Sequence, residues 1–246
     1  MAQLVEQFTR NEQVAGSIPA ISSNNKVVSV KKYVVFDFDD TLVKSLDYWY
    51  KTMDKLGFKD YGFKPVKGFD KLRKGKGNKE IAQAFLNVTK LNISPEEVQQ
   101  NWAKHMQYFY SKKIKMLAGA YDYLLYLKNK GYKICIASAT NIDLLKTAFQ
   151  IFNISNLIDY VYSENSLGYA KHHSQFFTLL LEKLNCKPQD ILFFEDSYVS
   201  LSNATKCGID SVCIKTHYNK KYYDELKSKC KLVIKNYKNK QIYSLV

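Results

Sequence analysis

Short apolar runs that alternate with longer amphipathic stretches constrain the fold of this chain more than any other feature. From Tyr33 onward, runs rich in β-branched and aromatic residues recur at 33–38, 132–137, 158–162, 191–194, 211–214 and 232–234. Continuous apolar runs are typical of parallel strands whose two faces are both covered. Amphipathic patterns predict helices between them, at 121–130, 142–152, 174–184, 199–207 and 222–228. The sequence therefore predicts an α/β fold with a doubly wound parallel sheet.

The segment between Ser45 and Met116 breaks this alternation. It holds no convincing strand, but it has helix-like stretches at 79–91 and 95–110, the second with Ser94 as N-cap and Pro95 in the first helical position. These patterns predict a helical insertion after the first strand. We expect a disordered tail at 1–30, an α/β core formed by 31–44 and 117–246, and a helical cap at 45–116.

The first thirty residues are polar and show neither helical nor strand periodicity before Val27, which predicts a disordered tail. Codons for 2–7 and for 16–19 can read like the D-arm and the T-arm of a transfer RNA. We interpret residues 2–19 as a translated tRNA gene, which leaves the true N-terminus open.

The charge composition bears on possible partners. The net charge is +14, but the basic residues are lysines spread along the chain, apart from Arg10 and Arg73. Proteins that read phosphates and bases usually also use arginine forks. A dedicated nucleic-acid surface is therefore not expected, although the charge does not exclude one.

Cysteine usage and hydropathy bear on the compartment. Five cysteines without a CxxC pair favour reduced thiols over a disulfide framework or a zinc cluster. No apolar window is long enough to span a membrane, and the first thirty residues lack a signal segment. These features predict a soluble cytoplasmic protein with no membrane partner, and they leave its oligomeric state open.

Charged and hydroxyl side chains follow the predicted strands. Along the chain they form an acidic cluster, a hydroxyl, a lysine and an acid pair, at Asp37, Asp39, Asp40, Ser138, Lys171, Glu195 and Asp196. The carboxyl ends of strands in open α/β sheets form the ligand sites. Carboxylates packed together there are costly without a cation. This order after successive strands is improbable as coincidence and indicates a site for phosphate and a divalent cation.

Asp37-Phe38-Asp39-Asp40-Thr41 resembles the DxDxT motif of the haloacid dehalogenase-like (HAD) hydrolase superfamily, and the resemblance covers about 33–215. Ser138, Lys171 and Glu195-Asp196 match its second, third and fourth motifs. The string FEDSYVSLSNATKCGI is similar to a pattern of the branch that contains β-phosphoglucomutase and phosphoglycolate phosphatase, which carries a helical cap. The sequence departs from the common pattern at three places, with His172-His173 after the lysine, Ser200 for glycine and Lys44 for an acid.

The resemblance implies a Mg²⁺-dependent phosphatase that hydrolyses a small phosphorylated metabolite through an aspartyl phosphate. Asp37 is the implied nucleophile and Asp39 the general acid and base. The implied magnesium ligands are Asp37, Asp39 through its carbonyl, and Asp196, with Glu195 behind them. Thr41 is expected to orient Asp39, and the implied phosphate-binding residues are Ser138 and Lys171.

Other functions remain open at this stage. A phosphomutase of the same family would use the same residues, and a nucleic-acid-end phosphatase would suit the basic charge. A catalytically silent interaction module is less consistent with the intact set of acids, because buried acids without a cation are costly to keep.

A basic stretch precedes the predicted helix at 79–91. Residues 71–79 hold five cations and two glycines, which could face the non-reacting end of the substrate. On this hypothesis Arg73 and Lys76 bind a second anion of the substrate. The alternative is a solvated lysine-rich turn.

Overall fold

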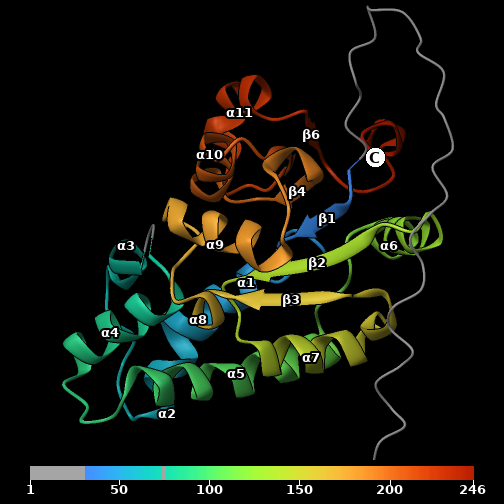
Figure 1. Ribbon diagram of the computed structural model, residues 1–246. Helices are drawn as coiled ribbons and strands as arrows, with labels where there is room; N and C mark the ends of the chain where they lie inside the picture. The colour runs from blue at the N-terminus through green and yellow to red at the C-terminus, as the bar shows by residue number, and fades with distance from the viewer. Residues whose placement is uncertain (1–30, 74–75) are drawn as a thin grey trace, which may run out of the picture.

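The computed structural model describes residues 31–73 and 76–246, so the predicted tail and its tRNA interpretation lie outside the described residues. Six parallel strands form one sheet in the order β3-β2-β1-β4-β5-β6 (Figure 1). The strands are Tyr33–Phe36 (β1), Lys133–Ser138 (β2), Tyr160–Ser163 (β3), Ile191–Glu195 (β4), Asp210–Ile214 (β5) and Leu232–Ile234 (β6). The predicted doubly wound α/β fold is confirmed, and β1 lies at the point where the strand order reverses.

Helices cover both faces of the sheet. On one face Ala120–Asn129 (α6) and Ile142–Ile151 (α7) pack against alternate side chains of the central strands, such as Phe36 and Phe194. The other face is covered by Ser174–Leu184 (α9), Tyr198–Lys206 (α10) and Tyr223–Lys229 (α11). Because both faces are buried, each strand must be apolar at successive positions, which is the pattern in the sequence.

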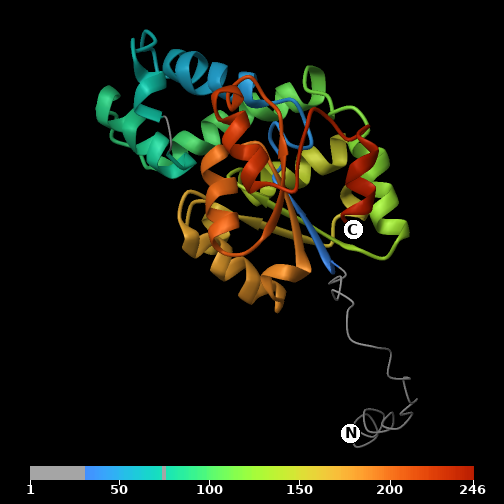
Figure 2. The same cartoon turned by 90° about the horizontal axis from the view of Figure 1, so that it is seen from above.

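The inserted helices lie beyond the carboxyl ends of the strands (Figures 1 and 2). They pack around buried aromatic rings, including Phe58, Phe85 and Trp102. Their bounds are Leu46–Lys51 (α1), Gly57–Asp60 (α2), Phe69–Arg73 (α3), Asn78–Thr89 (α4) and Pro95–Lys112 (α5), with a π-helical turn at Thr52–Leu56. The capping box at the start of α5 is present, since Ser94 and Glu97 bond each other's backbone amides.

Two further features of the described residues bear on the predictions from composition. All five cysteines are free thiols. None of the helices in the described part of the chain combines the length and apolarity needed to cross a lipid bilayer.

The C-terminal segment completes the core on the α6 side. The ring of Tyr237 is fully buried and packs near Phe36, Tyr123 and Phe194. Its hydroxyl donates a 3.1 Å hydrogen bond to the carbonyl of Thr41. Tyr237 therefore connects the end of the chain to the loop after β1.

Tyr237→Ala should lower the free energy of unfolding by about 3–5 kcal/mol, because it leaves a large cavity among aromatic rings. The measurement is thermal or urea unfolding followed by circular dichroism. Tyr121→Ala, at an exposed position of α6, is the matched control. Equal stability of the two variants would contradict the role of the C-terminal segment.

Candidate active site

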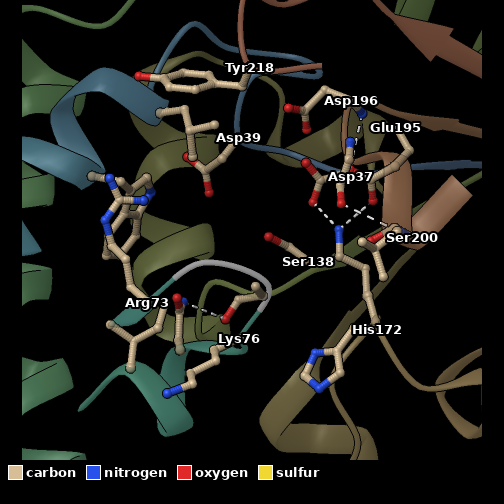
Figure 3. Close-up of a pocket in the computed structure, with 18 of the residues that line it drawn as sticks. Asp37, Asp39, Arg73, Lys76, Ser138, His172, Glu195, Asp196, Ser200 and Tyr218 are labelled. Carbon is tan, nitrogen blue, oxygen red and sulfur yellow. Dashed lines mark hydrogen bonds and ion pairs between the residues drawn. The ribbon is translucent and has the colours of Figure 1, made fainter. Parts of the chain in front are cut away.

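A cavity of about 500 Å³ lies between the carboxyl ends of the strands and the inserted helices (Figure 3). Most of the residues predicted for the site line it, namely Asp37, Asp39, Arg73, Lys76, Ser138, Lys171, Glu195 and Asp196. Thr41 is the one predicted residue that does not line this cavity. The structure therefore brings together groups that lie up to 159 positions apart, between Asp37 and Asp196.

Lys171 lies at the centre of the acidic cluster. Its Nζ donates to Asp37 Oδ1 at 2.5 Å and to Glu195 Oε2 at 2.7 Å, and all three side chains are buried. Burial alone lowers the pKa of Lys171, but the charges of Asp37 and Glu195 outweigh it and hold that pKa above the ordinary lysine value. The lysine is therefore a fixed cation that joins the first and fourth motifs.

Asp37, Glu195 and Asp196 form a group that could hold a metal ion. One carboxylate oxygen from each lies within 4.8 Å of the others. Burial, and then the charge of Glu195, raises the pKa of both Asp37 and Asp196 well above the ordinary aspartate value. One lysine does not balance three buried carboxylates. The set fits a hard divalent cation such as Mg²⁺, which prefers oxygen ligands.

Glu195 already uses both of its oxygens within the protein. Its Oε1 accepts hydrogen bonds from the backbone amides of Asp196 and Ser197, and its Oε2 accepts a hydrogen bond from Lys171. The side-chain amide of Asn219 fixes the same loop by donating a 2.7 Å hydrogen bond to the carbonyl of Asp196. Glu195 thus shapes the loop, while Asp37 and Asp196 keep oxygens available for a ligand.

Three hydroxyl groups hold the carboxylate of Asp39. Ser45 Oγ and Tyr110 Oη donate to Oδ1 at 2.5 and 2.6 Å, and Thr140 Oγ1 donates to Oδ2 at 2.7 Å. Burial, and then the charge of Asp39, raises the pKa of Tyr110 well above that of a free tyrosine, so the phenol remains a donor. The expected contact of Thr41 with Asp39 is absent. The hydroxyl of Thr41 is buried without a partner among the described residues.

The third acid of the first motif has a structural part in the fold. Asp40 adopts a left-handed backbone conformation, and its Oδ1 accepts the amides of Ser45 and Leu46 at the start of α1. These are the amides of the N-cap residue and of the first helical residue, which have no partner within the helix. Asp40 therefore belongs to the helix start and is not among the cavity-lining residues.

Ser138 lies at the carboxyl end of β2 with its side chain beside the cavity (Figure 3). Its Oγ accepts the amide of Thr140 at 3.1 Å. The adjoining helix α7 begins with Asn141 as N-cap, whose side chain accepts the amide of Leu144. The β2–α7 loop thus presents a hydroxyl where an oxyanion can bind.

The inserted helices close the other side of the cavity. Arg73 pairs with Asp54 through two hydrogen bonds, at 2.9 and 3.1 Å, and lies 3.5 Å from the ring centre of Tyr50. Lys76 is exposed at the cavity. Much of the guanidinium of Arg73 is therefore committed within the insertion, whereas Lys76 remains accessible to a substrate.

A close approach joins the insertion to the sheet edge. Asn78 Nδ2 donates to the carbonyl of Ala139 at 3.0 Å. A Cβ atom on Gly77 would lie 2.8 Å from Glu164 Oε2 and 2.9 Å from the side chain of Ala170. A side chain at position 77 would therefore have to displace Ala170 and Glu164.

Comparison with known proteins gives a family match. A model for the haloacid dehalogenase-like hydrolases matches residues 34–214. A protein named phosphorylated carbohydrates phosphatase, from Thermotoga maritima, is 20% identical over 179 residues, which cover 73% of this chain and 82% of the relative.

Solved structures resemble the whole described fold. CbbY from Rhodobacter sphaeroides, solved in complex with phosphate, matches with a TM-score of 0.73 at 17% identity. The match covers 85% of this chain and 96% of the CbbY chain. A putative β-phosphoglucomutase from Thermotoga maritima has a TM-score of 0.66 at 18% identity, with coverage of 87% and 99%. At this identity the likeness shows the shared fold.

Asp196→Asn should stabilise the metal-free protein at neutral pH. A carboxylate whose pKa is raised on folding holds its proton more tightly in the folded state, so stability is lost as the pH rises through that raised pKa. Removal of one carboxylate reduces this loss. We expect a higher melting temperature for the variant at about pH 8 and a smaller difference at about pH 5.

The same measurement with Mg²⁺ supplies the complementary result. Mg²⁺ should raise the melting temperature of the wild type and have much less effect on Asp196→Asn. Asp224→Asn, where the carboxylate is almost fully exposed, is the matched control and should respond to Mg²⁺ like the wild type. A metal-free Asp196→Asn protein less stable than the wild type at neutral pH would contradict this account.

Proposed function

The chain belongs to the haloacid dehalogenase-like hydrolases, and from this premise we propose that it is a Mg²⁺-dependent phosphatase of small phosphorylated carbohydrates. The resemblance found in the sequence is thereby confirmed at the level of the family. One observation carries the proposal, namely that Lys171 joins Asp37 to Glu195 beside Asp196 while Asp39 faces the same cavity. The relative named phosphorylated carbohydrates phosphatase supports the choice of substrate class.

Asp37 is the proposed nucleophile. Lys171 holds its Oδ1, so Oδ2 is the oxygen that attacks phosphorus to form an aspartyl phosphate. Asp39 protonates the departing oxygen of the substrate, and in the second step it accepts a proton from the water that hydrolyses the intermediate. Ser138 and Lys171 bind the phosphoryl oxygens and stabilise the charge on them in the transition state.

The proposed ligands of Mg²⁺ are the carboxylates of Asp37 and Asp196 and the carbonyl of Asp39, with Glu195 behind them. When bound, the ion supplies positive charge that offsets the repulsion between carboxylate and phosphate. The inserted helices, 45–116, are proposed to act as a cap over the core formed by 31–44 and 117–246. The close approach at Gly77 and Asn78 supports this assignment, because Asn78 bonds the β2–α7 loop and Gly77 lies against Glu164 and Ala170 of the core.

The alternative functions give different results in solution. A phosphomutase would need a bisphosphate activator and release little inorganic phosphate. A nucleic-acid-end phosphatase would bind its substrate with an affinity that falls steeply as salt increases. The proposed enzyme should release phosphate from sugar phosphates at physiological ionic strength without an activator.

Asp37→Asn should abolish phosphate release, since the amide is not a competent nucleophile. The measurement is release of inorganic phosphate from a panel of sugar phosphates and from phenyl phosphate with Mg²⁺. Wild-type activity should disappear with EDTA and return with added Mg²⁺. A mock purification from cells that lack this protein measures the background of contaminating phosphatases, and Asp224→Asn, prepared in parallel, should keep the wild-type activity. Substantial turnover by Asp37→Asn above that background would refute the assignment.

Lys76→Ala tests whether the substrate carries a second anion. We expect KM for such a substrate to rise about tenfold for each ~1.4 kcal/mol of binding free energy that the lysine supplies, while KM for phenyl phosphate stays nearly unchanged. Lys71→Ala is the matched control, because Lys71 is exposed and does not line the cavity. Lys76 is preferred to Arg73, whose removal would also leave Asp54 unpaired. Equal changes with both substrates would leave Lys76 without a part in recognition.

A further inference from the structure

The three hydroxyls around Asp39 leave its carboxylate few remaining hydrogen-bond positions. An ionised carboxylate has about four lone-pair positions, two on each oxygen. Ser45 and Tyr110 occupy both positions on Oδ1, and Thr140 occupies one on Oδ2. One position remains, on Oδ2. Asp39 is only half-buried and lines the cavity, so this position is open to a substrate.

The donors come from three separate parts of the chain. Ser45 directly precedes α1, Tyr110 lies in the last turn of α5, and Thr140 lies in the β2–α7 loop. All three side chains are buried, and the ring of Tyr110 packs near those of Phe38 and Phe152. Packing fixes each donor independently of the carboxylate, so the group can impose one orientation on Asp39.

Ser45 gives a further indication that this arrangement serves the site. It occupies the N-cap position of α1, where a serine side chain usually accepts an amide of the first turn. Here its hydroxyl makes no such bond and donates to Asp39, while Asp40 accepts the amides of Ser45 and Leu46. Asp40 thus satisfies two amides at the start of α1, while the hydroxyl of Ser45 is committed to Asp39.

We propose that Ser45, Tyr110 and Thr140 are positioning residues that fix the rotation of the Asp39 carboxylate, so that Oδ2 alone exchanges a proton with the substrate. The inference rests on the proposed phosphatase function. In the first step Asp37 Oδ2 bonds to phosphorus as the bond from phosphorus to the leaving oxygen breaks. The leaving oxygen keeps the electron pair of that bond and takes the proton from Asp39 Oδ2. In the second step a water molecule gives a proton to Asp39 Oδ2. The oxygen of that water bonds to phosphorus as the bond between phosphorus and Asp37 breaks.

Rotation of a free carboxylate explains why positioning matters. The terminal torsion of an aspartate has a broad energy profile, so an unheld carboxylate samples many orientations. Loss of one donor should therefore impair proton transfer to the leaving group more than cleavage of the bond to phosphorus. The kcat/KM should fall for substrates whose leaving group needs a proton, and it should stay nearly unchanged for those whose leaving group is stable as an anion.

The test compares kcat/KM of Tyr110→Phe on two substrates. Phenyl phosphate has a basic phenolate as its leaving group, which needs a proton, whereas the leaving group of dinitrophenyl phosphate is stable as an anion. We expect about a tenfold fall on phenyl phosphate, the size expected for loss of one hydrogen bond to a charged group. On dinitrophenyl phosphate the change should stay within about twofold. Tyr123→Phe is the matched control, since its hydroxyl is buried in α6 and bonds the carbonyl of Ile242.

A second donor keeps the result independent of any one variant. Thr140→Val should reproduce the selective loss on phenyl phosphate, and Thr140→Ser, which keeps the hydroxyl, should restore it. Equal losses on both phosphates with unchanged melting temperature, or no loss on either, would overturn the positioning role and leave the phosphatase function intact. A wild-type protein that hydrolyses neither phosphate with Mg²⁺ would overturn the proposed function itself.

Discussion

The ion pairs of Lys171 with Asp37 and Glu195 are the interaction on which the rest of the site depends. Buried carboxylates this close together repel one another, and removal of a buried partner commonly costs about 3–5 kcal/mol. Lys171 offsets part of that repulsion, and it holds Asp37 in one orientation. On the proposed function, a divalent cation would offset the remaining negative charge, so the same interaction would prepare the site for both metal and phosphate.

The sheet explains how these groups meet. β1 lies between β2 and β4, so the loops after these three strands share one edge. Their residues supply the proposed nucleophile, a hydroxyl and the acid pair, and the segment between β3 and α9 adds the lysine. The inserted helices then bring Tyr110 to the same edge, which gives Asp39 a donor that the sheet itself does not provide.

Much of the fold and the site could be predicted from the sequence, since buried parallel strands require continuous apolar runs and their ends carry the motifs. Helices α1, α2 and α3 were not predicted, because they are short and the hydroxyl of Ser45 is used elsewhere. Tyr110 lies 71 positions from Asp39, so only packing reveals their contact. Thr140 lies only two positions after Ser138, which the sequence does indicate as a site residue. Local spacing does not distinguish the hydroxyl of Thr140 from that of an ordinary loop residue.

On the proposed function, the phosphoryl group passes through Asp37. The direct measurement uses Asp39→Asn, in which hydrolysis of the intermediate should be slow, incubated with dinitrophenyl phosphate and Mg²⁺. Acid quench, borohydride reduction and mass spectrometry of the peptides would locate the acyl phosphate. We expect borohydride to reduce Asp37 to homoserine, and only when both the substrate and Mg²⁺ are present. A modified residue other than Asp37, or phosphate release with no modified residue at any time, would contradict it.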